Sequence, residues 1–252
     1  MKKKIIAISV AVILIIAAVA GASLAYLTDS KTATNTFTVG NVQIELIEKQ
    51  RDGKGGLEDF ENGKKLLPIV GSAQGKKDEL GLSTAKNYVD KIVTIKNLEE
   101  DAYVRAYIAL PAALDAEKAS DNILHINQPG KDTFVGLDGT TADKAYTWGD
   151  MTKVGSATID GIEYNVYYST YADKLTKDEI AGCAAYVGLY LDKDVNYDAE
   201  LGWTMRGQKI NYDLSQGVKL PVFAVGVQAA GFDSADAAID AAFGANYNPW
   251  AN

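Results

Sequence analysis

The chain opens with an apolar run and then changes to short alternating segments. After Met1-Lys2-Lys3-Lys4, residues 5–20 hold a single polar side chain, Ser9. From Val42-Gln43-Ile44-Glu45-Leu46 onward, apolar and polar positions alternate over short stretches. Alternation with a period of two predicts half-buried β-strands. The pattern therefore predicts an apolar leader followed by a β-rich domain.

The leader has the order of an export signal: a basic start, an apolar stretch and an exit of small residues. Small side chains, Ser23 and Ala25, stand at the third and first positions before a cut between Ala25 and Tyr26. We therefore expect a signal peptidase to remove residues 1–25 and the rest to be secreted. The alternative is a cell-surface protein with a retained anchor, because residues 5–25 match the ~20 residues that span a membrane. Either way, we expect membrane contact only through residues 5–25.

Strand-like alternation recurs along the rest of the chain. The predicted strands cover residues 42–46, 88–96, 102–110, 123–127, 146–151, 162–171, 186–191 and 218–227. The first pair after residue 88 is expected to form a hairpin, with Tyr103, Arg105 and Tyr107 on its wet outer face. Asp160-Gly161 predicts a tight turn before residue 162.

Helical signals are few. A short helix is expected over residues 112–121. A second is expected after Asp233 or Ser234 as the cap, ending at Gly244. Many strands and few helices predict an all-β, mainly antiparallel, jelly-roll-like β-sandwich with one or two short helices and an N-terminal hydrophobic signal helix. The expected organisation is a leader (1–25), an extended segment (26–41) and one β-sandwich domain (42–252).

Composition narrows the functional classes. The net charge of −8 argues against nucleic-acid binding, which needs a basic surface. Cys183 is the only cysteine, so no disulfide can form within the chain. We expect Cys183 to be buried, with an intermolecular link as the alternative.

Catalytic motifs are scarce. His125 is the only histidine, so a His-Glu-x-x-His zinc site is impossible. No Gly-x-Ser-x-Gly elbow or phosphate-binding loop occurs. His125 lies in an alternating stretch and is expected to be structural. The sequence therefore predicts a protein that is not an enzyme and has no required cofactor.

An oxygen-rich stretch is the best metal candidate. Its oxygen-bearing side chains recur at every second position: Asp192, Asp194, Asn196, Asp198 and Glu200. Ca²⁺ takes six to eight oxygen ligands, so this stretch could bind it. Tyr197 stands where an EF-hand loop needs glycine. The alternative is a solvated acidic loop.

Tyrosine is abundant, with fourteen residues. Many fall on the polar face of predicted strands. They are expected to pack across strands within the fold, or alternatively to form a surface for a partner.

Three stretches resemble a known family: Lys2-Lys3-Lys4, Ala25-Tyr26-Leu27-Thr28-Asp29, and Thr36-Phe37-Thr38-Val39-Gly40-Asn41-Val42. They are similar to the start of Gram-positive exported proteins processed by the SipW-type signal peptidase, which include TasA, a biofilm-matrix fibre subunit, and camelysin-like proteins. Two further stretches, 87–105 and 227–232, resemble other exported proteins with this signal. Camelysin-like relatives have been described as metalloproteases, and the single histidine departs from that activity.

The resemblance implies a fibre subunit that self-associates by donating its freed N-terminal segment to a neighbour's sheet. The segment's candidate contact residues are Leu27, Thr32, Thr34, Thr36, Phe37 and Val39. The alternatives are a disordered N-terminus or a first strand that pairs within its own sheet. Other functional classes remain open: a surface module that binds glycan or protein and is stabilised by Ca²⁺, and last a secreted protease.

Overall fold

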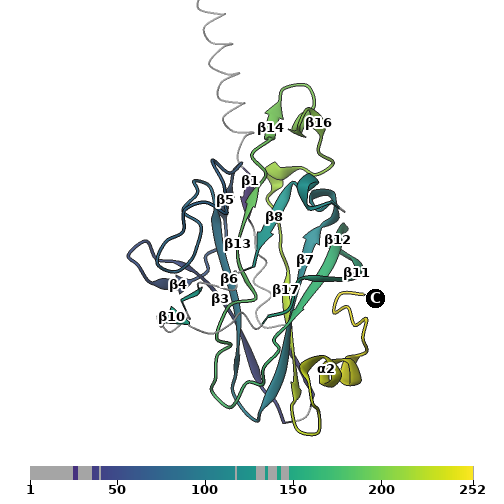
Figure 1. Ribbon diagram of the computed structural model, residues 1–252. Helices are drawn as coiled ribbons and strands as arrows, with labels where there is room; N and C mark the ends of the chain where they lie inside the picture. The colour runs from purple at the N-terminus through teal and green to yellow at the C-terminus, as the bar shows by residue number, and fades with distance from the viewer. Residues whose placement is uncertain are drawn as a thin grey trace, which may run out of the picture.

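Strands dominate the protein (Figure 1). The computed structural model describes residues 25–27, 36–39, 41–116, 118–128, 134–135, 141–142 and 148–251. In this part of the chain the strands form two five-stranded sheets and three smaller ones, and α2 (Ala235–Phe243) is the one α-helix. The predicted all-β, mainly antiparallel class is confirmed. The predicted signal helix lies outside the described residues, apart from Ala25.

Two large sheets lie face to face (Figure 1). The β17 sheet has the order β11 (Thr152–Ile159), β12 (Ile162–Thr170), β7 (Ala102–Pro111), β17 (Val222–Gln228) and β2 (Thr36–Val39). The β6 sheet has the order β4 (Leu57–Asp59), β3 (Ile44–Arg51), β6 (Val89–Asn97), β13 (Tyr186–Leu191) and β8 (Leu124–Asn127). Their neighbouring strands are antiparallel, except that β2 pairs parallel with β17.

Smaller elements complete the described chain. The small sheets are β1 (Ala25–Leu27) with β5 (Lys64–Leu66), β9 (Phe134–Val135) with β10 (Thr141–Ala142), and β14 (Val195–Asp198) with β15 (Gly202–Met205) and β16 (Gln208–Lys209). Three 3₁₀ turns are η1 (Ala112–Leu114), η2 (Ala119–Asp121) and η3 (Leu214–Gln216). Within these described ranges, no helix is long and apolar enough to cross a membrane.

The main core lies between the two large sheets. Alternate residues of β7, from Val104 to Leu110, join it together with side chains from β6 and β13. Cys183 also belongs to this core, so its predicted burial is confirmed. Burial of these alternating apolar faces stabilises the fold by about 25 cal/mol for each Å² of apolar surface removed from water. This burial holds the two sheets together.

Strands β6 and β7 do not form the expected hairpin. They belong to different sheets, and residues 98–101 carry the chain from one sheet to the other. The fully buried Asn97 holds this passage, because its amide donates to the carbonyl oxygens of Glu100 at 2.9 Å and Leu175 at 3.0 Å. Alternation identified both strands correctly, but it carries no information about which strand each one pairs with.

The outer face of β7 is also not wet, as the sequence had suggested. Tyr103, Arg105 and Tyr107 are buried beneath α2 and the C-terminal tail, which form a second apolar cluster with them. Figure 1 shows α2 on this outer side of the β17 sheet. The guanidinium of Arg105 is 1% exposed and donates to Asp236 at 2.7 Å and Asp240 at 3.2 Å. The packing of α2 on the β17 sheet therefore includes a buried cation that pairs with two aspartates of the helix.

The caps of α2 follow the sequence prediction. Ser234 has extended backbone angles and accepts a hydrogen bond from the amide of Ala237, and Gly244 ends the helix at φ +92°. A serine oxygen satisfies an amide that the helix itself cannot, and glycine tolerates positive φ. The other predicted helix, over residues 112–121, is wrong: only η1 and η2 form in this range.

The turn prediction at Asp160-Gly161 is confirmed. Both residues have positive φ, at 51° and 79°, and they join β11 to β12 as a hairpin. The acidic stretch after β13 is not simply a loop, because residues 195–198 form β14. The strand expected over residues 146–151 is reduced, among described residues, to a single bridge between Trp148 and Tyr171.

Candidate functional site

The described part of the N-terminal segment lies at the edge of the β17 sheet. Thr36 to Val39 pair in parallel with Ala224 to Val227, one residue to one residue. All other pairings in this sheet are antiparallel. A parallel strand cannot be joined to its neighbour by a tight hairpin, and β2 lies about 190 residues before β17 in the chain.

The strand that receives β2 is apolar on both faces. Ala224 faces the main core, whereas Val225 and Val227 belong to the cluster under α2. On its other side β17 pairs along its whole length with β7. If β2 left, the backbone groups of β17 would lose their partners along an apolar edge, which is a template for another strand.

The chain leaves β2 through a close packing contact. A Cβ atom on Gly226 would come within 2.9 Å of Ile44 Cγ2 and 3.1 Å of Val42 Cγ1. Val42 and Ile44 are both buried in the main core. Gly226 therefore lets the chain cross from the β17 sheet to β3 at this point.

The predicted cleavage junction lies in a second pairing. Ala25, Tyr26 and Leu27 pair antiparallel with Leu66, Lys65 and Lys64 respectively. Leu66 is fully buried, so β5 is fixed to the body of the domain. Of the other residues predicted for this site, Thr36, Phe37 and Val39 lie in β2, whereas Ser23, Thr32 and Thr34 lie outside the described residues.

The predicted calcium ligands do not converge. In the described ranges, no three histidine, cysteine or acidic side chains come together as a metal group. Four of the five residues hold hydrogen bonds or ion pairs within the chain. The Asp192 carboxylate lies 3.2 Å from His125, Asp194 pairs with Arg206 at 3.0 Å, and Asp198 accepts the amides of Glu200 and Leu201. The Asn196 side chain accepts the amide of Tyr197.

The spacing of residues along a strand explains why the alternating oxygen-bearing side chains do not converge on one ion. Residues 195–198 are extended, and a strand rises about 3.3 Å per residue, so every second side chain lies about 6.6 Å further on. Ca²⁺ ligands must all approach within about 2.3–2.6 Å of one ion. The hydrogen bond from Arg206 holds the pKa of Asp194 below its usual value, and the amide of Leu201 does the same for the pKa of Asp198.

A shallow groove of about 500 Å³ lies on the projecting β14–β16 sheet. Its walls combine carboxylates, an amide, a hydroxyl, a guanidinium and a ring: Asp194, Asn196, Tyr197, Asp198, Thr204 and Arg206. The sequence pattern did not reveal this sheet. Its turn at Arg206-Gly207 has φ of +51° and +76°, and arginine is not a residue type that predicts a turn of this kind.

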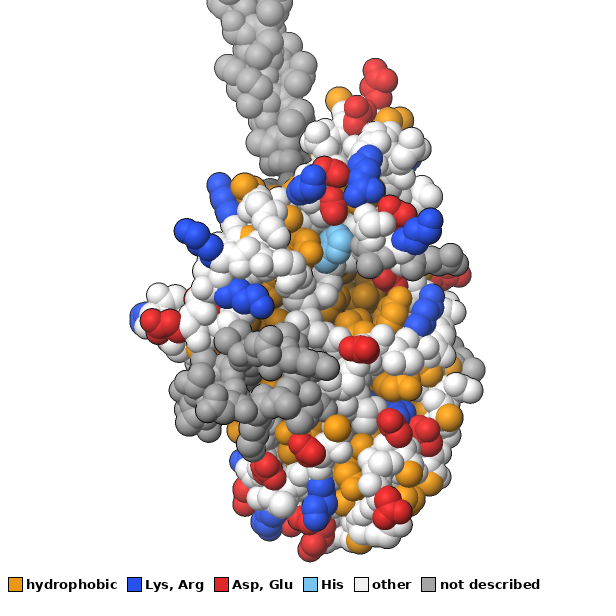
Figure 2. Space-filling view, in the orientation of Figure 1, with side chains coloured by type: hydrophobic (Ala, Val, Ile, Leu, Met, Phe, Trp, Pro, Cys, Tyr) orange, Lys and Arg blue, Asp and Glu red, His pale blue; other side chains and the backbone are white. Residues whose placement is uncertain are grey.

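His125 has a structural environment. Its ring stacks on Tyr190 with centroids 4.8 Å apart, and its Nε2 lies 3.2 Å from Asp192. The ring is pale blue in Figure 2 and reaches the surface on that face. Cys183 belongs to a different part of the core, where its carbonyl accepts the indole N–H of Trp148 at 2.8 Å. No described hydroxyl or thiol is hydrogen-bonded to His125 as a nucleophile would be.

The tyrosines are used mainly for packing. Tyr107 and Tyr168 are cross-strand partners in β7 and β12, with ring centroids 5.9 Å apart, which confirms the cross-strand prediction for this pair. Tyr247 of the tail meets Tyr107 edge-on at 5.9 Å. Burial raises the pKa of Tyr107 to about 12. Tyr107 is therefore an interior group, whereas Tyr168 and Tyr247 pack against it and stay partly exposed.

Comparison of the chain with protein-family models, with curated proteins and with solved structures gave no match.

Proposed function

We propose that the protein is an exported structural subunit that self-associates into an extracellular or cell-surface fibre, as in a biofilm matrix. In this proposal the SipW-type peptidase cuts after Ala25, and residues 26–41 of one subunit pair with β17 of the next. The finer architecture that goes with it is a jelly-roll-like β-sandwich. The proposed subunit is not an enzyme.

One observation carries the proposal: Thr36–Val39 lies at the edge of the β17 sheet, where the same strand of another copy can take its position. β2 is an edge strand, it is parallel in an otherwise antiparallel sheet, and Val42, which follows it in the chain, is buried in the main core. The same four backbone pairings with β17 can be made by β2 of its own chain or of another copy. Exchange of an identical element between copies costs little, because the contacts are the same in both states. Exchange in one direction along a row of subunits gives a filament.

Truncation tests the proposal. We expect the chain starting at Tyr26 to form filaments visible by electron microscopy, and the chain starting at Asn41 to remain a folded monomer. Near-ultraviolet circular dichroism and light scattering check folding and size. A peptide covering residues 26–41 should bind the truncated chain, whereas a peptide of scrambled sequence should not. Filaments formed by the truncated chain would contradict the proposal.

Two neighbouring proline variants provide a matched pair. Along a parallel strand, successive N–H groups point to opposite sides, so one of Phe37 and Thr38 directs its N–H to β17 and the other to the free edge. Proline removes that donor. We therefore expect Phe37→Pro and Thr38→Pro to differ, with only one of them blocking filament growth. Equal behaviour of the two variants would argue against pairing with β17 as the assembly contact.

The groove on the β14–β16 sheet favours a second candidate, a surface module that binds a glycan. Carboxylate, amide and guanidinium groups beside the Tyr197 ring suit sugar hydroxyls and an apolar sugar face. Isothermal titration with cell-wall oligosaccharides tests it, with Thr204→Val as the variant expected to weaken binding. Unchanged binding in this variant, or none in the parent protein, removes the candidate.

A further inference from the structure

We propose that β5 (Lys64–Leu66) is a charge-sensitive latch, which holds the N-terminal segment on its own domain before leader removal and releases it afterwards. The inference rests on the proposed function, because it explains when residues 26–41 become free to exchange. It concerns a different contact from β2 on β17.

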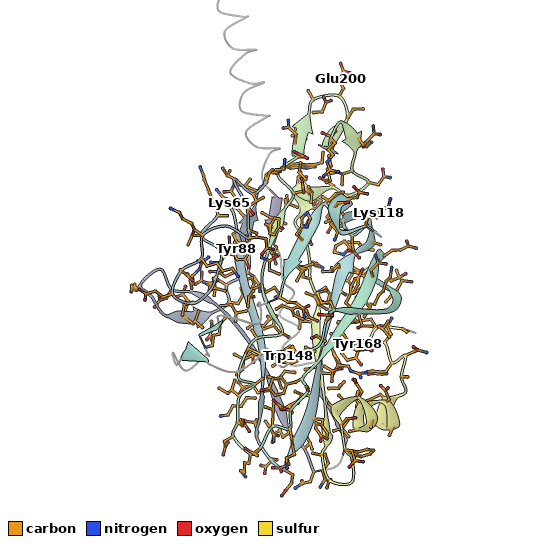
Figure 3. All side chains as sticks on the ribbon, in the orientation of Figure 1. Lys65, Tyr88, Lys118, Trp148, Tyr168 and Glu200 are labelled. Atoms are coloured by element: carbon orange, nitrogen blue, oxygen red, sulfur yellow. The ribbon has the colours of Figure 1, made fainter. Side chains whose placement is uncertain are left out.

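The uncut chain holds its N-terminal segment at two places. β2 pairs with β17, and β1 pairs with β5 around the junction itself. β1 also lies against η3, whose Leu214 is fully buried. Figure 3 labels Lys65, the residue of β5 that stands opposite Tyr26. A segment paired at both ends has a high effective concentration for its own domain, so exchange with another copy is disfavoured.

Cleavage changes the charge in this pairing. Hydrolysis of the Ala25–Tyr26 amide adds one water molecule and leaves a carboxylate on Ala25 and an ammonium on Tyr26. Before the cut, the nitrogen of Tyr26 is a neutral amide within the ladder. Afterwards it carries a positive charge, since an α-amino group has a pKa of about 7.7–8.0. The pair between Ala25 and Leu66 is lost at the same time.

The new ammonium lies on the residue that is paired with Lys65 in the register. Lys65 is exposed, and Lys64 is the next residue along. The Lys64 ammonium has a carboxylate of Glu61 at 3.6 Å. Carboxylates on neighbouring elements have partners of their own: Asp213 before η3 accepts from Ser215, and Asp90 binds Arg51. Like charges directly opposite each other destabilise a strand pair, so the cut weakens β1 on β5.

The latch can be measured in monomers, without filaments. Hydrogen exchange of the Lys64–Leu66 amides is compared between the full chain and the chain starting at Tyr26, both in the same detergent at pH 7. We expect lower protection in the cut chain. Cross-strand like-charge effects correspond to at most about a fivefold change, and the lost Ala25 pair adds to it.

Charge reversal separates the two causes. In the cut chain, Lys65→Glu places a carboxylate opposite the ammonium, so protection of β5 should recover severalfold and filament growth should begin later. Lys153→Glu makes the same charge change on β11, at the edge of the β17 sheet. It should alter neither the protection of β5 nor the onset of filament growth. If β5 protection in the cut chain equals that in the full chain, or does not rise in the Lys65→Glu variant of the cut chain, the charge-sensitive latch is overturned, even if filaments form. Protection that follows the charge supports the latch, even if filaments never form and the proposed function fails.

Discussion

Gly226 of β17 lies so close to Ile44 of β3 that a Cβ atom on the glycine would come within 2.9 Å of Ile44 Cγ2. This contact joins the two large sheets at the point where the chain passes from β2 to β3. Val42 and Ile44, which meet Gly226, are both buried in the main core.

Gly226→Val is therefore expected to destabilise the domain by about 1–3 kcal/mol, the usual cost of forcing extra methyl groups into a packed core. The midpoint of urea unfolding measures it. Adding Ile44→Ala removes both contacting methyl groups of the isoleucine, Cγ2 at 2.9 Å and Cδ1 at 3.3 Å, so the double variant should be more stable than the sum of the two single changes predicts. Simple additivity would show that Gly226 and Ile44 do not compete for this space.

We expect removal of the carboxylates that pair with Arg105 to destabilise the fold more than replacement of Arg105 itself. Its guanidinium is 1% exposed and donates to Asp236, Asp240 and Thr170. Changing both carboxylates to Asn leaves a buried charge without its counter-charges, whereas an apolar replacement of similar length avoids that penalty. Because the Asp236 and Asp240 side chains are 68% and 38% exposed, solvent screening keeps the cost below that of breaking a fully buried pair.

The double variant Asp236→Asn/Asp240→Asn should therefore be less stable than Arg105→Met in thermal or urea unfolding. Arg105→Lys is the control for geometry, because lysine keeps the charge but not the planar fork. If Arg105→Met is the least stable of the three, packing of the guanidinium against Tyr168, 4.2 Å away, outweighs the charge.

Asp198 should make the β14–β15 turn sensitive to acid. Hydrogen bonds from the amides of Leu201 and Glu200 hold its pKa below the ordinary value of 3.8. A lowered pKa in the folded state means that ionised Asp198 stabilises the turn at pH values above about 4, and that this contribution is lost as the pH falls through the folded pKa. Faster amide exchange of Leu201 in that acid range checks it.

Asp198→Asn is the matched variant for this turn, since its side-chain oxygen accepts the same hydrogen bonds but does not titrate over this range. Its turn should show no acid transition. An identical transition in the parent and the variant would assign the loss to another group.

Calcium is expected to leave the melting temperature unchanged. The extended backbone of β14 separates Asn196 from Asp198, and Asp194 and Asp198 already accept hydrogen bonds within the chain. Differential scanning fluorimetry with Ca²⁺ and with a chelator measures this. A rise in melting temperature with Ca²⁺ that disappears in Asp194→Ala would restore the predicted site.

The candidate functional site was only partly predictable. The sequence marked residues 26–41 as an extended segment next to a cut, because export signals and β preference are local patterns. It did not identify β5 or the edge of β17 as the places where this segment docks. Those partners lie about 40 and 190 residues away, and strand alternation does not name a partner.

Local signals determined the elements whose stability depends on neighbours in sequence. Among them are the turn at Asp160-Gly161 and the caps of α2, since each needs only its own backbone angles or a side chain within a few residues. The tertiary structure alone decided that β6 and β7 lie in different sheets and that Arg105 is buried under Asp236 and Asp240. The physical reason is that burial and pairing depend on groups brought together from about 40 to 135 positions apart, and no pattern within one strand records what will cover its second face.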